Sequence, residues 1–189
     1  NITIFDDGET APYRAGERRS LNAGFLNTID LSQIDILVGD LSYIIDMIRE
    51  DSSESFLSEL PMDKNRIGVI GHSLGGAVAI STMAVDSRVG AAMILDGWYA
   101  PVPDSVISGG LDNPIYHLGQ KQWSDPGNYL RMDQLLSHSS GPIYKMLIPG
   151  THHTDFTDMP LFTPFSLIIG YTKILDPVWL NDLMRRNTR

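Results

Sequence analysis

The 189-residue chain is long enough for one domain with a sizeable core, and its composition is that of an ordinary globular protein. Its net charge of -9, without any basic cluster, argues against a nucleic-acid partner. Cysteine is absent, which excludes disulfides and thiolate chemistry, and no apolar run approaches the roughly 18 residues that a transmembrane segment needs.

The first third of the chain contains one strong helical pattern. Residues 1–5 are apolar and β-branched, and residues 6–24 are polar with Gly, Pro and Arg, which predicts an exposed loop. Apolar side chains then recur every three or four positions over residues 34–48, as on one face of an amphipathic helix. The serine-rich, acidic stretch 51–59 and Pro61 end this helix.

Short apolar runs are spaced along the rest of the chain. Residues 67–70, 91–95, 115–118 and 143–148 are predicted to be strands, each apolar enough to be buried on both faces. A helix of small apolar residues is predicted over 75–83, directly after the first of these strands.

The connections between the later strands are less regular. Residues 97–113 contain two prolines and three glycines, which predicts a loop. A short helix is predicted over 128–137, with Leu130, Leu135 and Leu136 facing inward, and a closing helix is expected in the apolar tail that ends near residue 184. Strands that alternate with helices indicate an α/β fold with a mostly parallel sheet, and residues 1–189 are predicted to form a single domain.

Gly71-His72-Ser73-Leu74-Gly75 fits the pattern G-x-S-x-G between the first strand and its helix. In a nucleophile elbow, a sharp strand-to-helix turn holds a serine in strained geometry with its hydroxyl exposed above the sheet. Glycines are expected on both sides of Ser73 because a Cβ there would collide with the neighbouring strand and helix. The alternative is a glycine-rich connection that contains an incidental serine.

Functional groups of an open parallel sheet gather beyond the carboxyl ends of its strands. This rule selects Ser73, Asp96 and the adjacent pair His152 and His153, in the order serine, acid, histidine. An imidazole would remove the hydroxyl proton, and a carboxylate would orient the imidazole. Asp125, after the next strand, is the alternative acid.

The other histidines have simpler interpretations. His72 is expected to line the elbow, and His117 is expected to be structural because it lies inside a strand. Adjacent residues on an extended chain point in opposite directions, so His152 and His153 do not suggest a metal site. We expect neither a metal nor a cofactor.

Three motifs are more specific together than any one of them alone: GHSLGGA at 71–77, LDGW at 95–98 and GTHHTDFTD at 150–158. They resemble the platelet-activating-factor acetylhydrolase family of serine-dependent α/β-hydrolases, over roughly residues 28–170. The resemblance implies an α/β-hydrolase fold with Ser73 as nucleophile, Asp96 as acid and His153 as base. It also implies that the amide of Leu74 donates to the oxyanion hole.

Family members carry further strands ahead of the point where this chain starts, including the loop that donates the second oxyanion-hole amide. We therefore expect an N-terminal companion segment or chain of the same precursor, with the strand at 67–70 near the centre of the completed sheet. Asn1-Ile2-Thr3 fits the N-glycosylation sequon, which is compatible with a secreted enzyme.

The resemblance implies a serine esterase that cleaves a small-molecule or lipid ester, such as a short acyl ester of a phospholipid. Biosynthetic acyl transfer or lactonisation on the same triad is an alternative, and so is a non-catalytic hydrolase-fold binding protein. Candidate substrate-pocket residues are His72, Trp98, Tyr99 and Phe156, although the aromatic residues fit an apolar core equally well.

Overall fold

The computed structural model describes residues 2–4, 10–12, 32–50, 61–123, 125–159 and 186. Its contacts group into two units, residues 1–33 and 34–189. In the first unit, β1 (Ile2–Ile4) pairs in antiparallel fashion with β2 (Thr10–Pro12). β1 lies in the apolar, β-branched run, whereas β2 lies in the region expected to be a loop. A three-residue strand is too short to show a period in the sequence, and Pro12 is tolerated because it ends a ladder at an edge.

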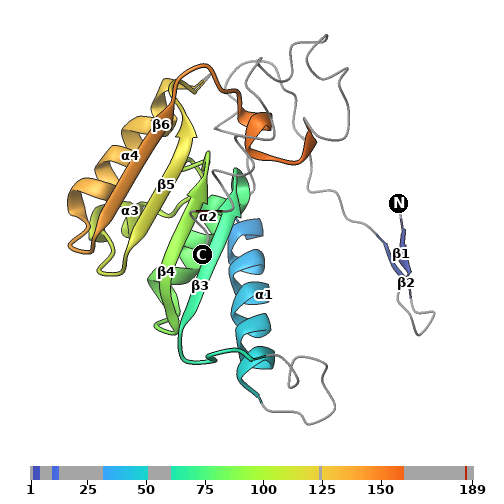
Figure 1. The fold of residues 1–189 in the computed structure, drawn as a ribbon. Coiled ribbons are helices and arrows are strands. Elements are labelled where there is room, and N and C mark those ends of the chain that lie inside the picture. Colours follow the sequence, from blue (N-terminus) through green and yellow to red (C-terminus); the bar gives the residue numbers. More distant parts are fainter. Residues whose placement is uncertain are drawn as a thin grey trace. The chain divides into compact units, whose positions relative to one another are not determined.

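The second unit is built on four parallel strands in chain order (Figure 1). They are β3 (Ile67–His72), β4 (Val89–Leu95), β5 (Ile115–Gln120) and β6 (Ile143–Ile148). All three pairings are parallel, which confirms the α/β prediction. Among the described residues β4 is the strand that pairs with β3, so the elbow strand lies at an edge of this four-stranded sheet. Its place near the centre of a completed sheet stays a prediction.

In the described part of the chain, four α-helices connect and cover these strands (Figure 1). They are α1 (Ser32–Arg49), α2 (Leu74–Val85), α3 (Asp104–Gly109) and α4 (Pro126–His138). In α2 every residue from 76 to 83 is buried, because glycine and alanine let the helix approach the sheet closely. The apolar stripe of α1 places Ile34 and Ile45 in the same core cluster as α2.

Two predictions for the helices were wrong. Residues 97–113 contain α3, whose Ile107 is buried, because Pro103 precedes a helical turn and Gly110 ends it, so the breakers flank the helix. Leu130 is 66% exposed. Leu135 and Leu136 are buried as predicted, and Asn128 and Met132 complete the inward face of α4 at helical spacing.

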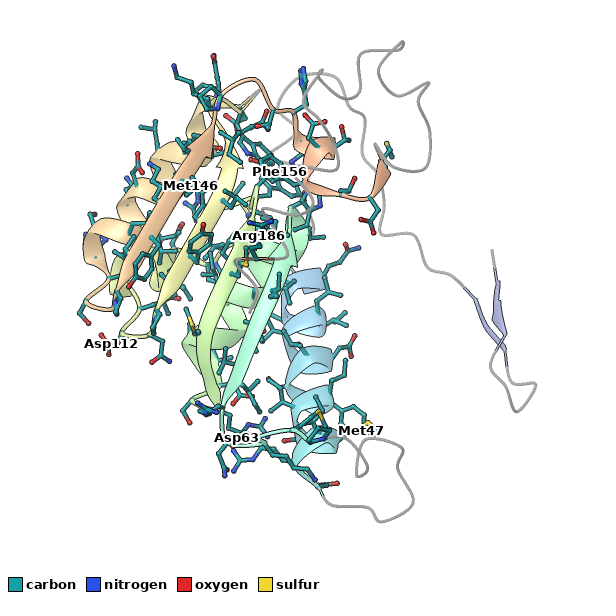
Figure 2. All side chains as sticks on the ribbon, viewed as in Figure 1. Met47, Asp63, Asp112, Met146, Phe156 and Arg186 are labelled. Carbon is teal, nitrogen blue, oxygen red and sulfur yellow. The ribbon has the colours of Figure 1, made fainter. Side chains whose placement is uncertain are left out.

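The strands bury side chains on alternate faces. Ile94 and Ile115 lie in the core cluster with α2, whereas Met93 and Leu118 lie in a second cluster with Phe156. Phe156 belongs to a short 3-10 helix, η3 (His153–Phe156), at the end of the sheet where the strands terminate (Figure 2). The closing helix expected before residue 184 lies outside the described residues.

Candidate active site

The strand β3 ends in a strained turn at Ser73. Its backbone has φ 56° and ψ -120°, an unusual conformation for a residue with a side chain, and α2 begins at the next residue. The Ser73 amide donates to the carbonyl of Leu95 at 3.1 Å. The Ser73 carbonyl accepts from the amides of Gly76 at 3.0 Å and Trp98 at 2.9 Å. These bonds hold the elbow between α2 and the chain that follows β4.

The glycines of the elbow differ in what they permit. A Cβ on Gly71 would lie 2.0 Å from the backbone oxygen of Gly75, so this position needs glycine. A Cβ on Gly75 would meet nothing within 4 Å, contrary to the expectation from the motif. The close approach falls one residue later, where a Cβ on Gly76 would lie 2.8 Å from Cγ2 of Ile94, because that side of α2 faces β4.

Asp96 lies directly after β4 and is wholly buried, with 0% of its surface exposed. Its Oδ1 accepts from the Gln120 amide at 2.9 Å and from the Trp123 indole nitrogen at 3.0 Å. Its Oδ2 accepts from the side-chain amide of Gln120 at 2.8 Å and from Nδ1 of His153 at 2.6 Å. Burial alone would raise the pKa of Asp96, but the bonds from His153, Gln120 and Trp123 outweigh it and hold the pKa below its usual value.

His153 is the first residue of η3, and the bond to Asp96 determines its tautomer. Because Nδ1–H donates to the carboxylate, the neutral ring carries its free electron pair on Nε2. The His153 carbonyl accepts from Nε2 of His72 at 3.1 Å, and the two ring centroids lie 4.5 Å apart. Burial lowers the pKa of His72, and the neighbouring His153 lowers it further. His72, which precedes Ser73, thus contacts His153, which binds Asp96.

The two alternatives weighed from the sequence have structural roles. The His152 amide donates to the Asp155 carboxylate at 2.6 Å, and the His152 side chain completes a capping box at the start of η3. Asp125 caps α4 and accepts from the amide of Gly127 at 2.8 Å. Of the residues proposed for the triad, the structure brings Asp96 and His153 into direct contact and places His72, next to Ser73, against His153.

The candidate pocket residues divide into two groups. His72 and Trp98 are partly exposed. His72 precedes Ser73, and the amide of Trp98 donates to the Ser73 carbonyl. Tyr99 is 1% exposed, and Phe156 is buried in the second core cluster, so neither offers an accessible surface. Tyr99 turns inward because its hydroxyl bonds Nδ1 of His117 at 2.9 Å.

His117 is buried within β5, as expected from its place in a strand. Burial lowers the pKa of His117 to about 4, so this imidazole is neutral at physiological pH.

Gln120, Trp123 and Tyr129 surround Asp96, although the sequence had not singled them out. The strand-end rule, applied to β5, would have selected Gln120. No comparable signal exists for Trp123, which lies in the connection to α4.

Within the described ranges, no group of three His, Asp or Glu side chains is arranged to hold a metal ion. The helices in that part of the chain include none that is long and apolar enough to cross a membrane.

Residues 45–176 match the family described as platelet-activating factor acetylhydrolase, isoform II. The chain belongs to this family. Its relatives include the platelet-activating factor acetylhydrolase of Bos taurus, 35% identical over 111 residues, which are 58% of this chain and 24% of that protein. The enzyme of the same name from Cavia porcellus is 26% identical over 156 residues, 82% of this chain and 32% of that protein. The chain therefore spans about a quarter to a third of the length of these acetylhydrolase relatives.

One solved structure of an esterase has the same fold as this chain. The ferulic acid esterase from Streptomyces cinnamoneus matches with a TM-score of 0.73 and 24% identity, over 99% of this chain and 53% of that chain. The chain therefore has the α/β-hydrolase fold.

Proposed function

We propose that this member of the acetylhydrolase family is a serine esterase that cleaves a carboxylic ester through an acyl-enzyme on Ser73. One observation supports this most strongly. Asp96 holds His153 at 2.6 Å, at the end of the sheet where Ser73 occupies a strained strand-to-helix turn. A carboxylate, an imidazole of defined tautomer and a serine in such a turn are the parts that acyl transfer needs.

In the proposed reaction, Nε2 of His153 accepts the Ser73 hydroxyl proton while Oγ attacks the ester carbonyl carbon. The Leu74 amide donates to the developing oxyanion, since the first amides of a helix have no partner within the helix. Collapse of the tetrahedral intermediate breaks the ester C–O bond, and His153 returns its proton to the leaving alcohol. Water, activated by the same imidazole, then releases the carboxylic acid and frees Ser73. Asp96 remains ionised throughout.

The relatives are named acetylhydrolases of platelet-activating factor. We therefore propose a short acyl chain on a phospholipid-like or other small ester as the substrate. His72 and Trp98, the two partly exposed pocket candidates, would border the ester. The N-terminal companion segment, its second oxyanion-hole amide and a secreted location stay predictions.

The test compares two serines of the same segment. Ser73→Ala is expected to abolish labelling by a fluorophosphonate probe and to lower hydrolysis of p-nitrophenyl acetate by several orders of magnitude. Ser81→Ala is the matched control, since Ser81 lies in α2 and its buried hydroxyl has no hydrogen-bond partner among the described residues. Normal labelling and hydrolysis in Ser73→Ala would overturn the proposal.

A second measurement separates hydrolysis from acyl transfer and defines the acyl chain. With added alcohol, an esterase still releases mainly the free acid, whereas a transferase forms the new ester. A series of p-nitrophenyl esters, from acetate to decanoate, is expected to give falling kcat/KM with acyl length.

A further inference from the structure

We propose that Trp123 is a positioning residue that joins the acid and the base of this site, through its indole N–H to Asp96 and its ring to His153. The inference rests on the proposed esterase function. It adds Trp123 to the proposed triad and assigns to Trp123 an electrostatic effect on His153.

The geometry of Trp123 links two residues from distant parts of the chain. Its Nε1 lies 3.0 Å from Oδ1 of Asp96, and its ring centroid lies 4.9 Å from that of His153, with an interplanar angle of 71°. The ring of His153 also contacts the ring of His72. The partly exposed side chain of Trp123, in the connection between β5 and α4, thus contacts both Asp96 and His153, which are joined by the 2.6 Å bond.

The Asp96 carboxylate needs such contacts because its terminal torsion is broad and roughly two-fold. Donors on Oδ1 leave Oδ2 directed at Nδ1 of His153. Gln120 contributes to both oxygens, and Tyr129 adds a long contact of 3.4 Å to Oδ1. Of these donors, Trp123 also places its aromatic ring edge-on against the imidazole.

The hydrogen bond from Trp123 to Asp96 also reduces the negative charge on the other carboxylate oxygen, Oδ2. An N–H donor on Oδ1 draws negative charge away from Oδ2, which weakens the attraction of the carboxylate for an imidazolium proton.

Ionisable groups from several elements face His153 or its acid. They are Asp96 after β4, His72 on β3, His117 on β5 and Tyr129 on α4, while His152 and Asp155 are neighbours of His153 in the chain and bond each other. Trp123 does not titrate, so replacing it changes a hydrogen bond without changing the charge of the site.

Trp123→Phe keeps an aromatic ring beside His153 and removes the N–H donor. We expect kcat for p-nitrophenyl acetate to fall about tenfold at neutral pH, with little change in KM, because the acid is less well held. The ascending limb of the kcat/KM profile is expected to move about 0.5–1 pH unit higher, since the acid then stabilises the protonated base more strongly.

Further variants separate the donor from the ring and test whether Trp123 acts through Asp96. Trp123→Gln retains an amide donor without the ring and is expected to leave the ascending limb close to its wild-type position. Gln122→Ala, at the exposed neighbouring residue, is the control for changes in this connection and should retain wild-type kinetics. In an Asp96→Asn background, Trp123→Phe is expected to cost little more, because a residue that acts through Asp96 loses its effect when the acid is gone.

A raised KM with an unmoved ascending limb would make Trp123 a substrate contact and overturn the proposal. An undiminished Trp123 effect in Asp96→Asn would overturn it too. Thermal unfolding of each variant shows whether it folds. If Trp123→Phe does not fold, Trp123→Gln is compared with the wild type instead. If Ser73→Ala is inactive but Trp123→Phe behaves like wild type, this inference alone fails; an active Ser73→Ala removes the proposed function.

Discussion

Ser73 and Asp96 are the two non-glycine residues with positive φ in the described part of the chain, at 56° and 44°. A side chain in this region costs roughly 1–3 kcal/mol and persists where the surroundings over-determine it. Both residues follow the carboxyl end of a parallel strand, and both carry a proposed catalytic role. The backbone strain of this fold is thus concentrated at the candidate active site.

The two histidines of the 150–158 motif allow a test at this scale. His153→Ala should lower kcat by several orders of magnitude because the proposed base is lost. His152→Asn should retain most activity, because asparagine can still cap η3. Steady-state kinetics on both variants checks this. Equal losses in the two would mean that the conformation of the segment, rather than one imidazole, limits the reaction.

The backbone of β5 passes close to the acid. A Cβ on Gly119 would lie 2.6 Å from Nε2 of His117, 2.8 Å from Oδ1 of Asp96 and 3.1 Å from the hydroxyl of Tyr129. This strand therefore needs glycine where it passes the carboxylate, and its next residue, Gln120, supplies two of the donors.

We expect Gly119→Ala to displace the Asp96 carboxylate and to lower kcat by up to about 10²-fold, as misplacement of a reacting group does elsewhere. The control is Gly90→Ala, where the added Cβ would meet the Ile67 carbonyl at an ordinary 3.5 Å. Kinetics and unfolding midpoints are measured for both. An unchanged kcat in Gly119→Ala would show that the acid site tolerates the added methyl group.

Much of the sheet could be predicted, because buried parallel strands are short apolar runs and the strand-end rule selects residues such as Asp96. The helix α3 could not, since six residues hold less than two helical turns of periodic signal. The contacts of Trp123 with Asp96 and His153 could not either, because they depend on how the connection after β5 folds back. Tyr99 was ambiguous for the same reason, as a loop has no period that separates inward from outward side chains.

For the molecule as a whole, the buried His117 links stability to pH. Its folded-state pKa is about 4, below the ordinary value of 6.5, because burial disfavours the charged ring. Between these values the unfolded chain binds a proton that the folded chain does not. The contribution of this group to stability is therefore full above about pH 6.5 and falls as the pH drops toward 4, by at most about 1.4 kcal/mol per pH unit.

His117→Phe should remove this part of the pH dependence while lowering stability at every pH, because the Tyr99 hydroxyl loses its partner. Urea unfolding at several pH values from 7.5 to 5 measures both effects, with His138→Gln as a control for the loss of an imidazole at an exposed position. A slope that His117→Phe leaves unchanged would assign the acid sensitivity to other groups.

The backbone bonds around Ser73 imply an order in which the site comes apart on heating. Ser73 is joined to Leu95 and Trp98, and Asp96 to Leu118, by main-chain hydrogen bonds of 2.7–3.1 Å at the carboxyl ends of the strands. His153 is joined to Asp96 and His72 through their side chains. We expect a temperature interval in which ester turnover is lost while far-UV circular dichroism is unchanged, and in which activity returns on cooling. Coincident midpoints for inactivation and unfolding would show instead that all three residues are lost in one cooperative step.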